Sequence, residues 1–422
     1  MTIAQLRPGP VAGRIRAPPS KSYTHRALVV GHLSGHRFRV DHPLDSEDTR
    51  ATAVALARLG TPVEYRTDSW TVQPGNGTRA GSISIDCGES GTTLRFLSAV
   101  AARDAGTTRF TGRTRLGARP MRGLLHALTA LGATVRVAPS GLPIEVRGPL
   151  RGGLVRVDAS SSSQFVSSLL LVLPTLPEDS RVHLTGDVVS GPYIEATLAV
   201  LDHHRVNVAR RGRDFSLPGG QSYRGSRFRV PGDASSAAYL WAAGALAGGP
   251  VRVDGIPKSW PQADHRILPL LRAFGAHVAS GNDWVSVSAG DRRPFSIDLT
   301  DAPDLYPLAG VLAASALGTS RIRGAVHVAH KESDRRAGTV RLARALGASV
   351  SEHRGGLLIQ GVREPRAIHL GRLADHRMVM SAAIGALAAG GPSRIGEAGA
   401  TQKSFPGFWD ALRAIGVEVR PV

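Results

Sequence analysis

The chain has 422 residues, of which 42% are hydrophobic and 20% are charged, a composition typical of a globular protein that excludes a disordered one. Its length predicts two or three domains, its single cysteine excludes an internal disulfide framework, and its N-terminus has no apolar core of a signal peptide. The longest apolar runs are shorter than the roughly 20 residues of a membrane span, so we expect a cytoplasmic protein without a membrane segment.

The formal net charge is +19, a value compatible with binding to nucleic acid. The arginines are spread along the chain, however, with one local concentration between residues 205 and 229, and aromatic residues make up only 5%. Few stacking platforms are therefore present for single-stranded nucleic acid. The charge instead favours the attraction of small anionic substrates, and we expect no nucleic-acid partner.

A helix that ends at a glycine and is followed by a short apolar strand recurs along the chain. The helix ends carry Gly60, Gly132, Gly275, Gly347 and Gly416, at spacings of 72, 143, 72 and 69 residues. Glycine is the expected stop because it accepts the left-handed conformation after the last turn. The double spacing predicts a sixth, degenerate copy near residue 204, so that six units of about 71 residues account for nearly the whole chain.

Each unit also contains a second helix that is apolar on nearly all sides. In chain order these helices are expected at residues 27–33, 94–102, 165–173, 237–247, 308–317 and 378–389. A helix without a polar face is buried on every side. The pattern predicts an α/β (α+β) protein in which sheets lie outside and surround helices within.

Cations gather just before these buried helices. The chain has four lysines against forty-eight arginines, and Lys21, Lys331 and Lys403 each lie in a short polar motif, whereas Lys258 does not. Serine, threonine and aspartate at such positions are ordinary N-caps, but caps do not explain Lys21, Arg26, Arg95 and Arg377. Backbone N–H groups, the helix dipole and added cations together form anion sites, so we expect binding of phosphate and carboxylate groups.

The motifs, in their order, resemble those of the 5-enolpyruvylshikimate-3-phosphate synthase family of enolpyruvyl transferases. They are Pro19-Ser20-Lys21-Ser22 with Arg26, Gly91-Thr92 with Arg95, Ala118-Arg119-Pro120-Met121, Ser162-Ser163-Gln164-Phe165, Ser190 with Pro192-Tyr193, Gly232-Asp233-Ala234-Ser235-Ser236, Pro303-Asp304, Lys331-Glu332-Ser333-Asp334-Arg335, Asp375-His376-Arg377-Met378, and Lys403 with Phe405-Pro406. Each motif is weak alone, and their joint order is specific.

The resemblance implies a two-domain inside-out α/β barrel with three repeats in each domain. One domain is expected to comprise residues 17–229, and the other residues 1–16 together with 230–422, with the active site in the cleft between them. The family also implies closure over the ligands, which excludes water and strengthens the charge contacts. We expect a monomer.

The resemblance also assigns two sets of substrate-binding residues. The set for shikimate 3-phosphate is Lys21, Ser22, Arg26, Ser162, Ser163, Gln164, Ser190, Asp304, His327 and Lys331. The set for phosphoenolpyruvate is Lys21, Gly91, Arg119, Gln164, Arg335, Arg377 and Lys403. The second division is chemically sensible, because a small ligand with a carboxylate and a phosphate needs several converging cations.

The reaction that the family implies is addition followed by elimination, without a cofactor. The ring 5-hydroxyl loses a proton as it attacks C2 of phosphoenolpyruvate while C3 gains one, and loss of phosphate and of a C3 proton restores the vinyl ether. The expected catalytic residues are Asp304 near the hydroxyl, Glu332 at C3 and Lys21 as acid or charge stabiliser. His25, His126 and His265 have no spaced carboxylate or cysteine partners, so we expect no metal site.

Simpler structural roles compete with two of these assignments. Asp304 is also a candidate N-cap of the following helix, and Glu332 with Arg335 has the spacing of an i,i+3 surface pair. A carboxylate at Glu89 beside the donor pocket requires a cation partner, for which Arg95 is a candidate.

Glu89 and His327, the latter at a position where an asparagine often contacts the substrate phosphate, leave a different acceptor open: a shikimate-like compound or UDP-N-acetylglucosamine. The enzyme that uses UDP-N-acetylglucosamine usually has a reactive cysteine shortly before the Ala-Arg-Pro segment, whereas Cys87 here precedes Glu89. A nucleic-acid-binding protein of related repeat fold is the second alternative.

Overall fold

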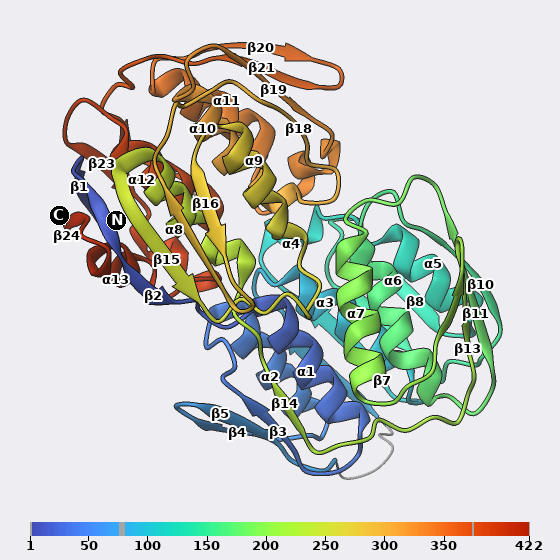
Figure 1. Cartoon of the computed structure of the whole chain (residues 1–422). Coiled ribbons are helices and arrows are strands. Elements are labelled where there is room, and N and C mark those ends of the chain that lie inside the picture. The colour runs from blue at the N-terminus through green and yellow to red at the C-terminus, as the bar shows by residue number, and fades with distance from the viewer. Residues whose placement is uncertain (1, 76–80, 374, 422) are drawn as a thin grey trace. The chain divides into compact units, whose positions relative to one another are not determined.

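The computed structural model describes residues 2–75, 81–373 and 375–421. The chain divides into two compact units, which are described separately: unit 1 comprises Met1–Pro18 and Pro231–Val422, and unit 2 comprises Pro19–Val230. Figure 1 shows the chain coloured from its N-terminus to its C-terminus. Across the described residues, no helix is both long enough and apolar enough to cross a membrane.

Each unit contains three four-stranded sheets among its described residues, and all six have the same strand order. Two parallel strands form one edge of each sheet, and two antiparallel strands complete it. These two are a hairpin in five sheets, whereas in the sixth they are β1 and β24, from the two ends of the chain. In unit 2 the sheets are β14(Arg227–Arg229)-β3(Phe38–Asp41)-β5(Ser69–Val72)-β4(Val63–Arg66), β6(Ser82–Asp86)-β7(Thr107–Thr111)-β9(Ile144–Arg147)-β8(Thr134–Val137) and β10(Leu154–Asp158)-β11(Ser180–Thr185)-β13(Asp214–Leu217)-β12(Ala209–Arg211). In unit 1 they are β2(Val11–Arg16)-β15(Gly248–Asp254)-β17(Trp284–Ser288)-β16(His277–Ser280), β18(Ser296–Asp298)-β19(Thr319–Arg323)-β21(Gly356–Gln360)-β20(Ser349–His353) and β22(His369–Leu370)-β23(Ser393–Gly396)-β1(Ile3–Arg7)-β24(Glu418–Pro421).

One long buried helix belongs to each sheet, and the three helices of a unit pack on one another. They are α1(Lys21–Leu33), α3(Gly91–Ala102) and α6(Ser163–Val172) in unit 2, and α8(Ala234–Ala247), α10(Tyr306–Ala314) and α12(His376–Leu387) in unit 1. Helix α8 is the clearest case, since twelve consecutive residues from Ala234 to Ala245 are buried. A helix without a polar face cannot lie at the surface, which explains why these segments occupy the centre of each unit.

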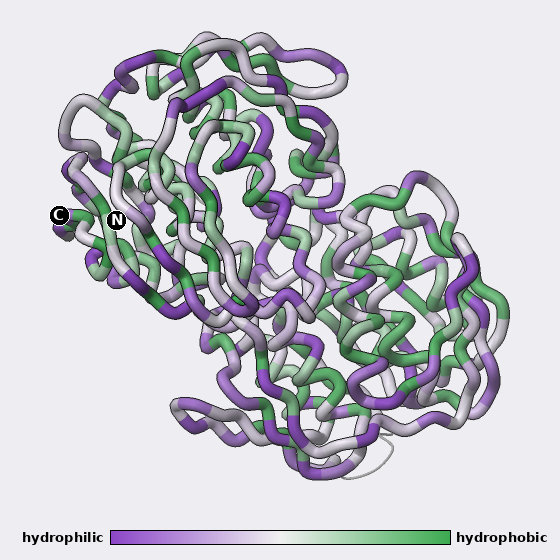
Figure 2. Tube along the Cα trace, viewed as in Figure 1, coloured by the Kyte–Doolittle hydropathy of each residue, from purple (hydrophilic) through white to green (hydrophobic). Residues whose placement is uncertain are grey.

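The remaining helices are amphipathic or short. They are α2(Glu47–Arg58), α4(Thr114–Gly117), α5(Arg122–Ala130), α7(Pro192–His203), α9(Ile267–Ala273), α11(Arg335–Ala345) and α13(Phe408–Ala414), with 3₁₀ turns η1(Leu173–Thr175), η2(Ala263–Arg266), η3(Pro303–Leu305), η4(Val326–His330) and η5(Ala398–Lys403). In strands such as β10 and β19 buried residues alternate with exposed ones. Figure 2 shows hydrophobic and hydrophilic residues interspersed along the trace. Each sheet therefore has one face on the core and one face in water.

The predicted helix stops are confirmed at the five glycines, all of which have positive φ values between 92° and 100°. The sixth copy is completed by Arg205, which has φ 58° although it is not a glycine. Its N–H donates to the carbonyl of Asp202, and the next N–H, of Val206, donates to Leu201. The repeat thus keeps its helix ending where the sequence has lost the glycine.

The predicted fold class is confirmed: the chain is an α/β protein of two three-repeat units, with helices inside and sheets outside in each. Three strands come from distant parts of the sequence among the described residues, since β14 completes the sheet of β3, β1 that of β23, and β2 that of β15. The starts of α1, α3, α6, α8 and α12 carry motifs that the sequence singled out, while those of Arg335 and Lys403 lie at α11 and η5.

Candidate active site

In unit 2, Lys21 is the first residue of α1 and its ammonium is held by a carboxylate of α2. Lys21 Nζ lies 2.8 Å from Asp48 Oδ2, and the two side chains are 18% and 7% exposed. Ser22 follows Lys21 in the first turn. Asp48 was not among the predicted site residues, because no local pattern shows which carboxylate, 27 residues further on, will face the lysine.

The starts of α3 and α6 are joined by one hydrogen-bonded chain of side chains. Arg95 Nη1 donates to Gln164 Oε1 at 2.7 Å, and Gln164 Nε2 donates to Thr92 Oγ1 at 2.9 Å. The other terminal nitrogen of Arg95, Nη2, donates to the carbonyl of Pro120 at 2.9 Å, and Pro120 follows Arg119 in the chain. This network brings the segments of Gly91, Arg119 and Gln164, all expected at the donor, to one place in unit 2.

Gly91 lies against the guanidinium of Arg119. A Cβ built at position 91 would stand 2.6 Å from Arg119 Nη1 and 3.5 Å from Arg95 Nη1. Arg119 Nη1 also donates to the carbonyl of Glu89 at 3.4 Å. The absence of a side chain at 91 therefore leaves room for a cation beside the first N–H groups of α3, which is where an anion binds well.

The serines predicted for the acceptor lie at the start of α6 and before α7. Ser162 is the N-cap of α6, where its hydroxyl accepts a hydrogen bond from the N–H of Gln164 at 3.2 Å. Ser163 is buried in the first turn, and Ser190 is buried in the loop before α7 with a left-handed φ of 57°. A positive φ at a serine is uncommon and marks a position where the chain is held for a reason other than local preference.

Arg26 lies deeper in unit 2 than the sequence analysis expects of a substrate ligand. It is 2% exposed, and its guanidinium donates to Thr197 Oγ1, Ser167 Oγ and the carbonyls of Ser22 and Tyr193 at 2.8–3.4 Å. Burial lowers the pKa of Arg26 to about 10. Arg26 thereby ties α1 to α6 and α7, and its contact with the acceptor stays a prediction.

Glu89 is placed 3.6 Å from Arg113 Nη1, and the two side chains are 37% and 73% exposed. Arg95, the partner considered from the sequence, donates to Gln164 and Pro120. A surface ion pair of this kind contributes little to stability, but it places a cation on the carboxylate beside the expected donor pocket.

In unit 1, Arg335 is the centre of a buried charge cluster. It is 1% exposed, and its guanidinium donates to three carboxylates, those of Asp304 at 2.7 Å, Glu332 at 2.6 Å and Asp375 at 2.9 Å. Burial opposes the charge of Arg335, but Asp375, Glu332 and Asp304 raise its pKa above its ordinary value. We call these four residues, with Arg377 and Lys331, the unit-1 cluster.

Asp304 is held by three cations of this cluster. Its two carboxylate oxygens accept hydrogen bonds of 2.7 Å from Arg335 and from Arg377, and Lys331 Nζ lies 3.9 Å from Oδ1. Burial would raise the pKa of Asp304, but Arg377, Lys331 and Arg335 hold it far below its ordinary value. The N-cap interpretation is wrong, since Asp304 lies in η3 and the cap position of α10 is Leu305. The Glu332–Arg335 pair is real but buried, with side chains 12% and 1% exposed, so it is not a surface pair.

Asp375 is the residue of this cluster that the site prediction omitted. It is fully buried, caps α12 through the N–H of Arg377 at 2.9 Å, and accepts a hydrogen bond of 2.8 Å from the Ser333 hydroxyl. Burial opposes its charge, but Arg335 and His376 lower its pKa to about 2. Its position two residues before Arg377 was a usable signal, because an N-cap carboxylate there can reach both the helix start and a neighbouring cation.

Asp264 in η2 is a further buried carboxylate, 2% exposed, that was not predicted. It accepts a hydrogen bond from the hydroxyl of Ser235 in the first turn of α8. Burial and the charge of Asp304 raise the pKa of Asp264 to about 7, against the opposing effect of Arg377. Asp264 is thus a carboxyl that is largely protonated below neutral pH, beside a cluster of ionised ones.

The two remaining predicted residues of unit 1 lie in 3₁₀ turns. Lys403 ends η5 and is 7% exposed, and η5 packs against α12. His327 lies in η4, where burial and the charge of Lys331 lower its pKa to about 4. His327 is therefore a neutral imidazole at pH 7, able to donate one hydrogen bond rather than to act as a cation.

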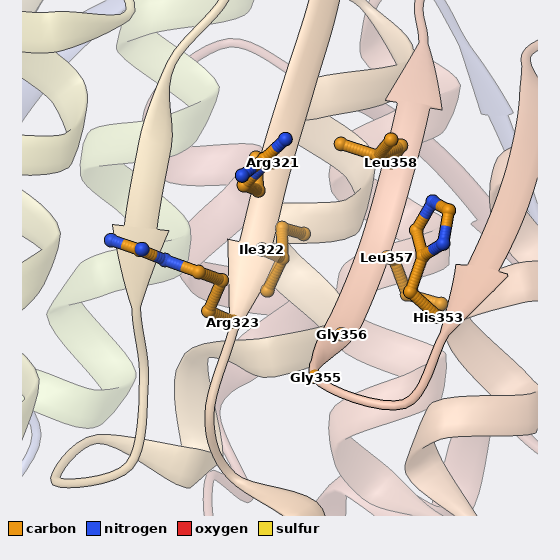
Figure 3. Close-up of a pocket in the computed structure, with 8 residues that line it drawn as sticks. All are labelled: Arg321, Ile322, Arg323, His353, Gly355, Gly356, Leu357 and Leu358. Atoms are coloured by element: carbon orange, nitrogen blue, oxygen red, sulfur yellow. The ribbon is translucent and has the colours of Figure 1, made fainter.

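Cys87 is buried, and burial raises its pKa, so this thiol is not an activated nucleophile. Within the described ranges, no group of three or more histidine, cysteine, aspartate or glutamate side chains could hold a metal ion. A pocket of about 230 Å³ lies elsewhere, over β19, β20 and β21, and is lined by residues such as Arg321, Arg323 and His353 (Figure 3). None of the predicted site residues lines it.

The charged side chains described in each unit have the chemistry needed to bind a dianionic ligand that undergoes proton transfer. Each unit contains guanidinium groups and at least one lysine ammonium, and the unit-1 cluster adds ionised carboxylates that can accept a proton. Arginine in such positions binds phosphate or carboxylate through paired hydrogen bonds.

Comparisons with known proteins agree with this arrangement. Residues 6–412 match the family model of EPSP synthase (3-phosphoshikimate 1-carboxyvinyltransferase). Proteins named 3-phosphoshikimate 1-carboxyvinyltransferase from Thermococcus kodakarensis and Methanocorpusculum labreanum are 42% and 38% identical to the chain. The first alignment covers 96% of this chain and 98% of the relative, and the second covers 97% of each.

Two solved structures share the fold. An EPSP synthase from Acinetobacter baumannii is 22% identical with a TM-score of 0.82 and covers 100% of both chains. The enolpyruvyl transferase NikO from Streptomyces tendae is 17% identical with a TM-score of 0.83, over 100% of this chain and 99% of that one. Together with the family model and the curated relatives, these findings show that the chain belongs to the EPSP synthase (3-phosphoshikimate 1-carboxyvinyltransferase) family of enzymes.

Proposed function

We propose that this chain transfers the enolpyruvyl group of phosphoenolpyruvate to the 5-hydroxyl of shikimate 3-phosphate, which gives 5-enolpyruvylshikimate 3-phosphate and phosphate. Membership of the family carries this proposal, and the buried cluster of Arg335 with three carboxylates supports it.

The donor is bound by cations and by groups at helix starts. Its expected ligands are Lys21, Arg119, Gly91, the side chain of Gln164, Arg335, Arg377 and Lys403. The acceptor is bound by Ser22, Ser162, Ser163, Ser190, Lys331 and the neutral imidazole of His327, with Arg26 behind Ser22. In these assignments the anionic groups of the ligands meet cations, and the hydroxyl groups of the ligands meet neutral hydrogen-bonding side chains.

Asp304 and Glu332 carry the proton transfers of the addition step. In the ligand-free state Asp304 is a weak base, because Arg377, Lys331 and Arg335 lower its pKa. When the donor's carboxylate and phosphate bind these cations, part of that stabilisation is cancelled and the basicity of Asp304 increases. In the addition Asp304 accepts the hydroxyl proton and Glu332, in its protonated form, delivers a proton to C3. In the elimination Glu332 takes a proton from C3, and Lys21 neutralises the departing phosphate.

The bonds formed and broken balance over the two steps. Addition forms the C–O bond at C2 and places a proton on C3. Elimination breaks the bond from C2 to the phosphate oxygen and removes a proton from C3, so the vinyl group is restored without oxidation or reduction. We propose a monomer that uses no cofactor and no metal. A cytoplasmic location follows from the substrates, since multiply charged phosphates do not cross a membrane unaided.

A phosphate-release assay tests the proposal. Phosphoenolpyruvate with shikimate 3-phosphate should release phosphate, whereas phosphoenolpyruvate with UDP-N-acetylglucosamine, or alone, should not. Activity only with another cyclic alcohol would assign the chain to a different acceptor, a candidate that Glu89 beside the donor pocket favours. The buried Cys87, with its raised pKa, argues against the UDP-N-acetylglucosamine reaction, which uses a reactive cysteine in the family that performs it. Oligonucleotide binding with a steep salt dependence, and no phosphate release, would instead indicate a nucleic-acid protein.

A further inference from the structure

The first turns of α1 and α2 are joined at two levels, one helical turn apart. At the outer level Lys21 Nζ bonds to Asp48 Oδ2 at 2.8 Å. At the inner level His25 Nδ1 bonds to Thr52 Oγ1 at 2.8 Å. Lys21 and His25 are four residues apart, as are Asp48 and Thr52, so the two bonds lie one above the other.

The inner bond continues into α3. Thr52 Oγ1 lies 2.7 Å from Thr93 Oγ1, and Thr93 Oγ1 lies 2.7 Å from Ser90 Oγ, the N-cap of α3. The N–H of Thr93 also bonds to Ser90 Oγ at 3.2 Å. A hydrogen-bonded chain therefore runs from α1 through α2 to the turn that presents Gly91. We call His25, Thr52 and Thr93 the inner rung.

The inner rung is buried and stays neutral. His25, Thr52 and Thr93 are each at most 1% exposed. Burial lowers the pKa of His25 to about 3, with Lys21 and Arg26 acting in the same direction and Asp48 against them. The imidazole is thus uncharged at every pH at which the enzyme would work, and the rung does not change with pH.

The outer level, in contrast, contains a residue that the proposed reaction uses. Asp48, at 2.8 Å, compensates part of the charge of Lys21, so weakening this contact would make more of that charge available to a phosphate. Ser20 makes no side-chain capping bond to α1 within the described chain, and Arg26, which donates to the carbonyl of Ser22 at 2.9 Å, ties this turn by hydrogen bonds to α6 and α7 rather than to α3. If Asp48 were the principal link, its exchange for the donor would also release the helix starts.

We propose that His25, Thr52 and Thr93 are positioning residues that keep α1 and α3 in register while Lys21 exchanges Asp48 for the donor. This inference rests on the proposed function, because it assigns the exchange to the binding of phosphoenolpyruvate. The outer level is the exchangeable contact, and the inner rung is the permanent one.

Isosteric substitutions separate positioning from simple stability. Thr52→Val and Thr93→Val remove a hydroxyl without changing the shape of the side chain, while Thr52→Ser and Thr93→Ser keep the hydroxyl. We expect the valine variants to lower kcat/KM for phosphoenolpyruvate by at least about 10-fold and the serine variants to stay within about 2-fold of the wild type, since small misplacements of binding groups are costly. The KM for shikimate 3-phosphate should change little.

Ser98→Ala is the matched control in α3, because the buried Ser98 hydroxyl bonds only within its own helix, to the carbonyl of Leu94 at 2.6 Å. It should lower Tm without lowering kcat/KM. If the valine variants behave in the same way, with a lower Tm and unchanged kcat/KM, the rung is merely structural and the proposal fails. Equal losses in the valine and serine variants of Thr52 would also overturn it.

Hydrogen exchange of the ligand-free protein tests the inner rung without any assay of activity. Thr52→Val should speed exchange of the amides in the first turns of α1 and α3, while Lys21→Met, which removes the outer level, should leave them nearly unchanged. The reverse result would assign the positioning role to Asp48 and Lys21. If the wild type released no phosphate, the proposed function would fail, and this exchange measurement would still decide the role of the rung.

Discussion

Gly91 and Arg119 are in such close contact that a single methyl group at position 91 would stand 2.6 Å from the arginine's Nη1. The obstacle is the end of a flexible side chain, so Gly91→Ala should fold and should displace the guanidinium. We expect KM for phosphoenolpyruvate to rise about 10-fold, with a small change in Tm, because a displaced cation loses its contact with the anion. Steady-state kinetics measure this change. Gly407→Ala is the control, since no atom lies within 4 Å of a Cβ there; equal KM values in the two variants would contradict the expected role of Arg119.

Glu332 should be needed for turnover more than for binding. In the wild type, Arg335 Nη2 donates to the Glu332 carboxylate at 2.6 Å. Glu332→Gln keeps an oxygen that can accept this hydrogen bond but removes the carboxylate that would exchange a proton with C3 of the donor. We expect the Kd for the donor to change little and kcat to fall at least about 100-fold. Calorimetry and phosphate release measure the two quantities. Glu352→Gln, in the more exposed pair with Arg336, is the control, and near-normal turnover of Glu332→Gln would remove this residue from the proton transfers.

Lysine and arginine should not be interchangeable at three of the four lysines. Lys21 and Lys403 are mostly buried, at 18% and 7% exposure, and Lys331 lies 3.9 Å from Asp304. A guanidinium is larger and planar and cannot replace a compact ammonium in such spaces. We expect Lys→Arg to lower kcat/KM at least about 10-fold at each of these positions. At the exposed Lys258 the same change should have no measurable effect; a comparable loss there would indicate that the assay reports folding yield rather than the site.

Acid should destabilise unit 2 before unit 1. Burial lowers the pKa of His25 to about 3 and of His32 and His204 to about 4. Below about pH 6.5 the unfolded chain binds protons that the folded unit does not. As the pH is lowered, the free energy of unfolding therefore decreases by up to about 1.4 kcal/mol per pH unit for each histidine. In unit 1, burial also lowers the pKa of His265 and of His327, and the raised pKa of Asp264, about 7, acts in the opposite direction and offsets part of this loss. Hydrogen exchange at pH 7 and pH 5 measures both units, and an equal loss of protection in the two would contradict this account.

Arg205→Gly should stabilise unit 2. Arg205 is the one helix stop of the six repeats that has a positive φ without being a glycine, among the residues described, and its φ is 58°. A left-handed backbone costs a non-glycine residue about 1–2 kcal/mol, part of which is returned by the greater flexibility of glycine in the unfolded chain. We expect the free energy of unfolding, measured by urea titration, to rise by about 1 kcal/mol. Gly132→Ala, at φ 100°, is the converse control and should lower it.

The sequence predicts the repeats and the helix starts well, because both depend on local patterns. Apolar residues at helical spacing and a polar cap lie within a few residues of one another, so the ends of α3 and α8 were predicted at the residues observed. Both helices start three residues earlier than predicted, because their first turns hold the polar motifs. The structure also shows the limits of this approach at Arg205, where a helix ends with a residue that gives no stop signal.

The partners of the charged residues could not be predicted, since pairing across the fold leaves no local pattern. Asp48 holds Lys21 from 27 residues away, and Asp375 bonds Arg335 from 40 residues away. The depth of Arg26 was missed for the same reason, because Ser167 and Thr197, which surround it, belong to another repeat. Residue types thus indicated the ligand chemistry, while the order of contacts in each cluster required the structure.

The hydrogen bond of 2.8 Å from the N–H of Asp233 to the carbonyl of Pro18 joins the two places at which the chain leaves unit 1. Neighbouring bonds, from Ala17 to Asp254 and from Gly232 to Gly255, fix both of these segments beside β15. Unit 2 is therefore an insertion with adjoining ends, and a few residues between Pro18 and Pro231 would close unit 1 into one uninterrupted chain. The molecule can accordingly be divided into two separately encoded polypeptides, or permuted at this point, with every sheet of both halves left intact.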